Sequence, residues 1–368
     1  MELVALSRNY REFYAPTFAI RLGTSDLMRD LQVAVSQVEV DLELGATSRF
    51  SFTVTDAYNL KHHAFETGRG QPALGVLKFG TELDVCMGYG DARSVPVMMG
   101  GMITEVTTSF PEVGSPELAI AGYDHGFPLT LGKNARTWSN ARDSTAVQEI
   151  TSDNNLDSVI EQTEQEQDQI EQNQESDWEF VKKLADRNHF ELYVDEQRRL
   201  HFAKPKDKAT AVVTLKWGEG LLTFKPEANL AGQIAKVEVY GWDRTKKDRI
   251  VGVARAGEES GLKGQSAGQR LNTFVRQPGK EPTLRLRQPV FTQAEATERA
   301  KAALNERAKQ FLTGEAEAIG LPELRPDRRV ELANLGDPFS KTYYIQQATH
   351  KLDSNGYRTR FKVKEAGL

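Results

Sequence analysis

The chain has 368 residues, a formal net charge of −5 and a globular composition, with 39% hydrophobic and 27% charged residues. At roughly 100–200 residues per domain, this length predicts two or three domains. The acidic balance argues against a general nucleic-acid binder, which is normally basic. A single cysteine, Cys86, excludes an internal disulfide and a zinc site built on cysteine pairs.

The first third of the chain is predicted to be β. Residues 38–55 read as a hairpin, because apolar side chains alternate with polar ones on both sides of a glycine turn. Further strands are expected where short apolar runs are bounded by glycine or proline, at 74–79, 82–88, 95–108 and 117–123. Several short strands with glycine turns favour a barrel or sandwich. We therefore expect a first β-barrel domain over residues 1–130.

A helical and α/β insertion is predicted over residues 131–205. It begins with a helix expected from Asp143 to Asn155, for which Asp143 or Ser144 is the N-cap. Residues 161–176 are rich in Glu and Gln and nearly devoid of apolar side chains. That composition favours a solvated, mobile connection.

The second helix of the insertion has a local start signal. Ser176 and Glu179 match a capping box, in which a serine and a glutamate three residues later bond each other's backbone. The apolar residues that follow share one face of the expected helix: Phe180, Val181 and Leu184. A hairpin with strands at 192–194 and 200–202 is expected next.

The last third, residues 206–368, is predicted to be a second β-barrel domain. A strand is expected at 234–240, a long polar loop at 255–282, and a helix over 292–312 that opens on a second capping box at Thr292. These elements make the last third a mixture of helix and strand.

The C-terminus returns to strand. Residues 343–349 and 357–364 are expected to pair through an Asn-Gly turn. The second of these strands carries a stripe of basic side chains on one face: Arg358, Arg360, Lys362 and Lys364. The stripe is either a solvated sheet face or a surface that docks onto an acidic partner.

The sequence carries no recognised catalytic or metal-binding motif. The six histidines form neither HExxH nor an i, i+4 pair, and no nucleophile elbow or phosphate loop occurs. Glu175, Asp177 and Glu179 are the candidates for a glycosidase carboxylate pair. Capping explains Glu179, and the position of Asp177 at a helix N-terminus explains that residue. We therefore expect no enzyme activity, no catalytic residue, no cofactor and no metal.

Three stretches, in order, resemble the phage late control gene D family, which also contains the N-terminal hub part of VgrG-type spikes. They are Ala121–His125 with the helix after it, Gln172–Ala185 with its hairpin, and Leu335–Ile345 with the closing strands. The resemblance spans residues 120–365. The motif residues are expected to be structural: Tyr123, Asp124, Ser176, Asp177, Trp178, Glu179, Phe180, Leu184, Gly336, Phe339, Tyr343, Tyr344, His350 and Tyr357.

The resemblance implies a mainly β fold with α+β insertions. Two tube-like β-barrel domains are joined by helices, and three chains form a pseudo-hexameric ring. Such a ring is the structural baseplate hub of a contractile, phage-tail-like injection system. It adapts a hexameric inner tube to a trimeric spike, and its partners are the inner tube protein, the spike and the baseplate wedge components. No nucleic-acid sequence recognition is implied.

One departure from the family concerns the spike. VgrG-type spikes continue into a β-helical needle, whereas this sequence ends at Leu368 after the last strand, so a separate spike protein is expected. The first residues lack a secretion signal, and no run of 18 apolar residues predicts a membrane span. Synthesis in the cytoplasm and assembly into a tail-like particle are therefore expected, with release from the cell left open.

Two rival functions remain open at this stage. A tail-tip cell-wall hydrolase would need a buried acid with a raised pKa beside a second carboxylate. A receptor-binding β-protein would favour exposed aromatic side chains in loops. The polar segments at 161–175 and 255–282 are candidates for subunit or baseplate contacts.

Overall fold

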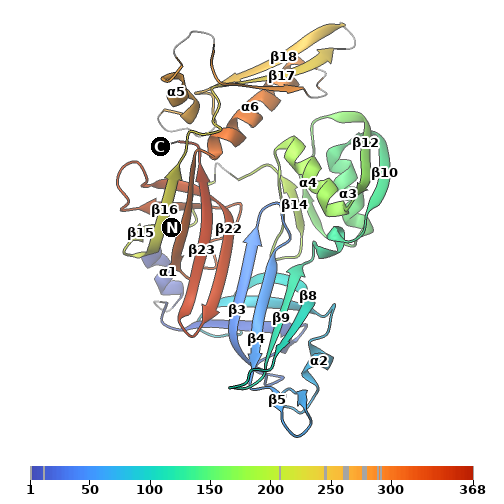
Figure 1. The fold of residues 1–368 in the computed structure, drawn as a ribbon, viewed down its shortest axis with the longest axis vertical. Helices are drawn as coiled ribbons and strands as arrows, with labels where there is room; N and C mark the ends of the chain where they lie inside the picture. Colours follow the sequence, from blue (N-terminus) through green and yellow to red (C-terminus); the bar gives the residue numbers. More distant parts are fainter. Residues whose placement is uncertain are drawn as a thin grey trace. The chain divides into compact units, whose positions relative to one another are not determined.

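The computed structural model describes residues 2–10, 13–206, 209–243, 247–259, 265–275, 280–287, 290 and 292–367. These residues form a mainly β structure with a few helices (Figure 1). They divide into two compact units. Unit 1 contains Met1–Pro205, Glu317–Asp327 and Gln347–Phe361, and unit 2 contains Lys206–Ala316, Arg328–Gln346 and Lys362–Leu368. Two segments of the last third thus belong to unit 1, and the three-domain division at residues 130 and 205 stays a prediction.

Unit 1 is built on an antiparallel sheet with the strand order β2-β1-β7-β8-β9-β4-β3, and β3 pairs with residues 347–352 of β22. The strands are β1 Pro16–Leu22, β2 Ser25–Asp26, β3 Ala34–Glu43, β4 Arg49–Thr55, β7 Glu82–Tyr89, β8 Val97–Ser109, β9 Glu117–Asp124 and β22 Lys341–Asp353. The predicted hairpin over 38–55 is confirmed as β3 and β4. Its alternating apolar side chains, among them Val38, Phe50 and Phe52, are buried in one core.

Smaller elements complete this part of unit 1. They are α1 Leu3–Asn9, the hairpin of β5 Tyr58–Asn59 and β6 Ala64–Phe65, and α2 Ala73–Val76. The strand expected at 74–79 is wrong, because α2 occupies its start. Pro72 precedes the helix with φ at −57°, and Ala73 and Leu77, four residues apart, are both fully buried. That spacing places two apolar side chains on one helical face.

The insertion of unit 1 holds two helices and five strands. They are β10 Asn134–Arg142, α3 Asp143–Asp153, β11 Ser158–Ile160, β12 Glu166–Glu175, α4 Asp177–Asn188, β13 Glu191–Val194 and β14 Leu200–Ala203, preceded by a 3₁₀ turn at Phe127–Thr130. β13 and β14 confirm the predicted hairpin, and β11 joins them in the order β11-β14-β13. The N-cap of α3 is Arg142, not Asp143 or Ser144, and it makes no side-chain cap bond. Asp143 instead accepts hydrogen bonds from Arg187.

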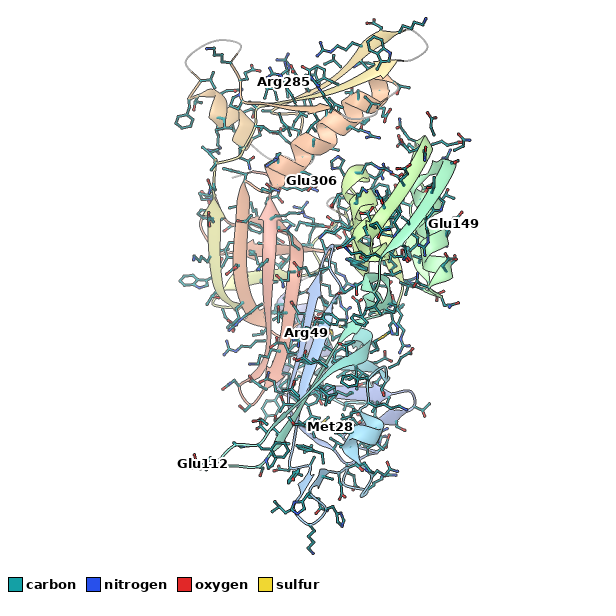
Figure 2. All side chains as sticks on the ribbon, turned by 45° about the vertical axis from the view of Figure 1, so that its right-hand side comes forward. Met28, Arg49, Glu112, Glu149, Arg285 and Glu306 are labelled. Carbon is teal, nitrogen blue, oxygen red and sulfur yellow. The ribbon has the colours of Figure 1, made fainter. Side chains whose placement is uncertain are left out.

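The mobile connection expected at 161–176 is wrong, because most of it is strand β12. It pairs antiparallel with β10, and Ile170 lies opposite Trp138 in the register. Both side chains are buried in the core of the insertion. Trp138 also donates to Glu149 of α3 at 2.5 Å, and Figure 2 labels Glu149 in the insertion. One apolar pair and an antiparallel backbone ladder with β10 therefore hold a strand that composition alone assigns to a linker.

Unit 2 supplies most residues of a closed six-stranded barrel. Its strand order is β22-β21-β15-β16-β20-β23, and β23 pairs back with β22. The strands not yet introduced are β15 Thr214–Trp217, β16 Gly220–Ala228, β20 Leu312–Ile319, β21 Arg329–Ala333 and β23 Gly356–Glu365. The predicted C-terminal hairpin is confirmed, with Gly356 at φ +98° in its turn. The barrel expected over residues 1–130 remains a prediction.

A three-stranded sheet and two helices form the rest of unit 2. The sheet has the order β18-β17-β19, with β17 Lys236–Asp243, β18 Asp248–Arg255 and β19 Thr283–Arg287. Helix α6 Gln293–Lys309 covers one of its faces (Figure 1). Only half of the predicted capping box is present, since Thr292 accepts from Glu295.

The loop expected at 255–282 is wrong in part, because it contains the helix α5 Ala267–Asn272. Ser266 and Gln269 form a reciprocal capping box that starts this helix. Residues 260–264 and 276–279 of the expected loop lie outside the described residues. Within the described ranges, no helix combines the length and the apolar character that crossing a membrane requires.

Candidate functional site

The start of α4 is fixed by the capping box that the sequence predicts. Ser176 Oγ accepts from the backbone N–H of Glu179 at 3.2 Å, and Glu179 accepts from the N–H of Ser176 at 2.8 Å. The apolar face of the helix is buried through Trp178, Phe180 and Leu184. Phe180 stacks on Trp138 with ring centroids 5.3 Å apart. These motif residues hold α4 against the rest of the insertion.

Asp177 is the centre of a polar cluster beneath α4. Its Oδ1 accepts from Gln172 and Arg136 at 2.8 Å and from Asn134 at 2.9 Å. Burial alone would raise the pKa of Asp177, but the hydrogen bonds from Gln172 and Asn134 and the charge of Arg136 lower it overall. The carboxylate therefore stays ionised and ties α4 to β10 and β12.

Asp124 is a second buried carboxylate, and it lies in the Gly-Tyr-Asp strand β9. It is 1% exposed and accepts from the backbone N–H of Ser48 at 2.6 Å and of Gly126 at 2.8 Å. Burial raises its pKa to about 7. A methyl group at Gly126 would lie 2.6 Å from the ring of Trp178. The absence of a side chain at Gly126 therefore leaves room for Trp178 of α4. The neighbouring motif residue Tyr123 stacks on Phe127.

The carboxylates that a hydrolase would use are each engaged in structural contacts. Glu175 pairs with Lys183 at 2.9 Å, Asp177 binds four side chains of the insertion, and Glu179 caps its helix. Asp124 has the raised pKa of a general acid, which sequence reasoning missed. Its donors are the backbone N–H groups of Ser48 and Gly126 and the side chain of Ser48, however, and at 1% exposure it is closed to a substrate. None of these contacts creates an acid–base pair facing solvent.

His350 and Tyr357 meet in the core of unit 1. His350 is fully buried, and its Nε2 lies 2.9 Å from the carbonyl oxygen of Leu324. Since a carbonyl only accepts, Nε2 carries the proton. Nδ1 then accepts from the hydroxyl groups of Tyr357 at 2.9 Å and Thr359 at 3.1 Å. Burial and the charge of Arg325 lower the pKa of His350 to about 3, so this imidazole is a neutral structural group.

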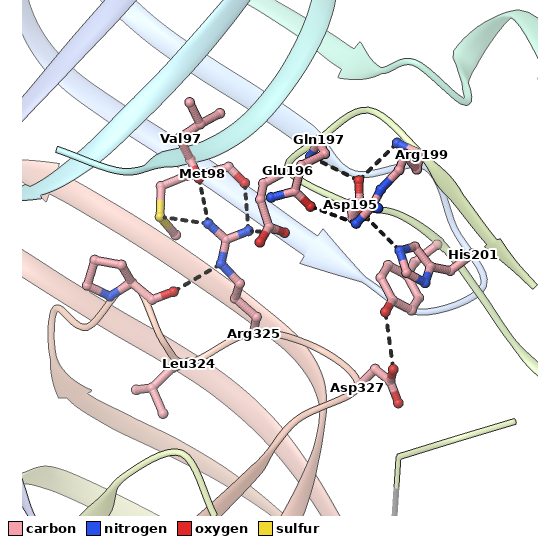
Figure 3. Close-up of polar contacts among 12 residues, drawn as sticks. Val97, Met98, Asp195, Glu196, Gln197, Arg199, His201, Leu324, Arg325 and Asp327 are labelled. Carbon is pink, nitrogen blue, oxygen red and sulfur yellow. Dashed lines mark hydrogen bonds and ion pairs between the residues drawn. The ribbon is translucent and has the colours of Figure 1, made fainter. Parts of the chain in front are cut away.

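Arg325 joins three segments of unit 1 that are distant in sequence (Figure 3). Its guanidinium donates to the carbonyl oxygens of Val97 at 2.7 Å, Met98 at 3.2 Å and Pro322 at 3.0 Å. It also pairs with Glu196, in the β13–β14 turn, at 3.0 Å. The side chain is buried, and these hydrogen bonds replace the bonds to water that its N–H groups lose on burial. Sequence reasoning missed Arg325, because no local pattern marks it.

The remaining motif residues lie in unit 2. Gly336 has φ +78° and opens a turn in which Ser340 donates back to its carbonyl oxygen. Tyr343 donates to the carbonyl oxygen of Phe339 at 2.9 Å, and burial raises the pKa of its hydroxyl. Tyr344 is buried, with the ammonium of Lys364 5.3 Å from its ring. The fourteen motif residues thus enter local structural contacts, and their role as a family signature stays a proposal.

The basic stripe of β23 is less uniform than expected. Arg358 and Arg360 are exposed and both pair with Glu317, at 3.0 and 3.3 Å. Lys364 is buried and belongs to the Tyr344 contact, so it does not lie on a solvated face.

Burial raises the pKa of the Cys86 thiol to about 11. Among the residues that the structure describes, no three His, Cys, Asp or Glu side chains are grouped to hold a metal ion.

Residues 15–354 match the family model described as the Alg8 N-terminal domain. No curated protein matches the sequence. The fold is similar to that of the tail protein from Neisseria meningitidis MC58, with a TM-score of 0.66 and 13% identity over 96% of this chain and 97% of that chain. It is similar also to the 43 kDa tail protein of prophage MuSo2 from Shewanella oneidensis, with a TM-score of 0.68 and 13% identity over 95% and 98%.

A third solved structure with this fold is the E. coli c3393 protein, a component of the type VI secretion system with structural similarity to T4 bacteriophage tail proteins. Its TM-score is 0.51 and its identity 12%, over 94% of this chain and 76% of that chain. At these identities the likeness concerns the fold alone. This chain therefore has the fold of tail proteins and of a type VI secretion component.

Proposed function

This chain belongs to the family described as the Alg8 N-terminal domain, and we propose that it is a structural baseplate hub of a contractile, phage-tail-like injection system. Three copies would form a ring that adapts a hexameric inner tube to a trimeric spike. The partners would be the inner tube protein, a separate spike protein and the baseplate wedge components. The matched family carries another name than the late control D family, so kinship with the latter is part of the proposal.

One observation carries this proposal. The fold is similar from end to end to two tail proteins, with 95–96% of this chain and 97–98% of theirs covered. A fold does not fix a function by itself. The function of a structural component, however, depends directly on its fold. The similarity to the two tail proteins covers that fold.

The chemistry of the buried acids supports a role without catalysis. Asp177 is held ionised by its donors, and Asp124 is closed to solvent. Glu175 and Glu179 are engaged by Lys183 and by the start of α4. A hydrolase would need one of these groups to face a substrate beside a second carboxylate. The same residues serve well as structural anchors.

A specific observation favours a second candidate function, receptor binding. Phe110 is 62% exposed and lies beyond the end of β8, with its ring 5.5 Å from Tyr58 and 5.9 Å from Phe65. Phe79 is also exposed. Such aromatic groups in loops are typical of surfaces that bind sugars or other proteins. Glycan-array binding that F110A abolishes would support this candidate over the hub.

The hub proposal is tested by tagging the chain in its native host and imaging what purifies with it. Sheathed, rod-like particles with label at the baseplate end are the expected result. Label elsewhere on the particle, or a lone protein without tube, sheath or spike components, would overturn the hub function. A turbidity assay on cell walls with the same material tests for hydrolysis.

A further inference from the structure

The sheet β18-β17-β19 has one face covered by α6 and one face that points away from it. Along β17, Val237 and Val239 are buried against α6, and the residues between them point to the other side. The register aligns the residues of this other side across the three strands. They include Lys236, Glu238, Tyr240 and Trp242 of β17, Arg249 and Arg255 of β18, and Arg285 and Arg287 of β19. We call them the basic face.

The basic face is rich in the residue types that dominate protein interfaces. Five cations share it with one carboxylate, Glu238, although the chain as a whole is acidic. Trp242 is 54% exposed, and the guanidinium of Arg249 lies 4.3 Å from the ring centroid of Tyr240. Figure 2 shows Arg285 on the side of the sheet away from α6. Arg, Tyr and Trp are enriched among the residues that carry binding energy.

The arrangement favours a protein partner over a nucleic acid. Glu238 lies in the middle strand and pairs with Lys236 at 2.6 Å and with Arg285 at 3.1 Å. A carboxylate at that place repels phosphate groups, whereas a surface that tracks a nucleic-acid backbone is uniformly basic. The pairs with Glu238 also hold Lys236 and Arg285 in place. Such a face suits a protein partner whose carboxylates have the spacing of alternate residues on a β-strand.

This chain itself carries a surface of that kind. Residues 161–175 contain six acidic residues and no basic one. Four of these carboxylates are exposed along and just before strand β12: Glu164, Glu166, Asp168 and Glu171. We call them the acidic ribbon. Glu166 and Asp168 are two residues apart on one strand, as are Arg285 and Arg287 on β19. Both pairs therefore have a spacing of about 6.6 Å, twice the rise per strand residue.

We infer that the basic face of one copy docks onto the acidic ribbon of a second copy of this chain. The two surfaces belong to different units of the chain, so the contact is head-to-tail, and such contacts close into rings when the rotation allows it. The number of copies in the ring rests on the proposed function, which requires three. The contact also gives the acidic segment at 161–175 a role in subunit assembly.

Charge reversal in the full chain tests this contact. R285E/R287E and E166K/D168K each place like charges against each other, which is expected to weaken self-association about 100-fold or more, as measured by sedimentation at low salt. The combination R285E/R287E/E166K/D168K restores opposite charges and should restore association. The control R69E/K78E changes two exposed residues of unit 1 outside both surfaces and should associate like the wild type. Circular dichroism checks that each variant is folded.

Mixing the fourfold variant with wild type identifies contacts between different copies. Each should associate with itself and neither with the other, because every mixed contact sets like charges together. Any of three results would overturn the inference. They are free exchange of subunits between the fourfold variant and wild type, unchanged association of R285E/R287E, and a wild type that is monomeric at every concentration. Binding of an oligothymidine that R285E/R287E abolishes, with association unchanged, would overturn it too and assign the face to nucleic acid.

This test is independent of the hub function. Charge-dependent association of a chain that purifies without any tail-like component would keep the contact and remove the hub. Labelled particles together with charge-insensitive association would keep the hub and remove the contact.

Discussion

The substitution D124N probes the most strongly perturbed carboxylate of the β9 motif. Burial raises the pKa of Asp124 from 3.8 to about 7. The folded chain then holds a proton that the unfolded chain releases, so the stability linked to this group is complete below about pH 4 and is lost as the pH rises through 7. At 1.36 kcal/mol per pKa unit, the loss amounts to roughly 4 kcal/mol. Asparagine carries no charge at any pH and avoids this loss.

His350 acts in the opposite direction, so the wild-type profile alone does not isolate Asp124. Its pKa falls from 6.5 to about 3. The stability linked to His350 is therefore present above about pH 6.5 and is lost as the pH falls, because the unfolded imidazole takes up a proton that the folded one refuses. The two contributions overlap between pH 4 and 6.5. The difference between wild type and D124N removes the histidine contribution, since both chains contain it.

The assay is urea unfolding at a series of pH values, followed by tryptophan fluorescence. Trp138 and Trp178 are buried in unit 1, and Trp178 packs against Gly126 beside the substituted carboxylate. From about pH 4 to about pH 8, D124N should gain roughly 4 kcal/mol relative to wild type. E112Q, at an exposed position, is the control and should run parallel to wild type. A D124N profile parallel to wild type across that range would refute the reasoning.

Three further substitutions test the anchors of unit 1. G126A places a methyl group 2.6 Å from the Trp178 ring and should destabilise unit 1 by about 1–3 kcal/mol with a red-shifted tryptophan emission; an unchanged spectrum would contradict the packing. S176A removes the acceptor at the start of α4 and should lower the free energy of unfolding by about 1 kcal/mol, whereas S176D should retain most of it. R325K should lose about 3 kcal/mol in denaturant unfolding, because an ammonium cannot reach all the acceptors of a guanidinium fork; wild-type stability of R325K would show that these contacts contribute little.

Local signals in the sequence predicted the elements that local physics determines. The β3–β4 hairpin follows from strict alternation with one buried face. The start of α4 follows from Ser176 and Glu179, three residues apart. In both cases the stabilising partner lies within a few residues, so the pattern is visible without the fold.

The elements that sequence reasoning missed depend on distant partners. β12 is polar, and its burial comes from Trp138, which lies 32 positions before Ile170. The high pKa of Asp124 comes from its burial in the folded chain, and the hydrogen bond from Ser48, 76 positions away, lowers it only in part. Arg325 binds Val97 across 228 positions. Composition and periodicity describe a residue's neighbours along the chain, and these three features are set by its neighbours in space.

The sequence motif and the surfaces proposed for assembly consist of different residues. Apart from the exposed Glu179 and the half-buried Tyr123, the motif residues of unit 1 are buried, and polar groups such as those of Asp177 and His350 are hydrogen-bonded inside the unit. Such residues maintain a fold and leave no group to meet a partner. The exposed charges of the basic face and the acidic ribbon lie outside the motif. A signature of buried anchors therefore identifies the architecture, and the assembly must be read from surfaces that the signature does not contain.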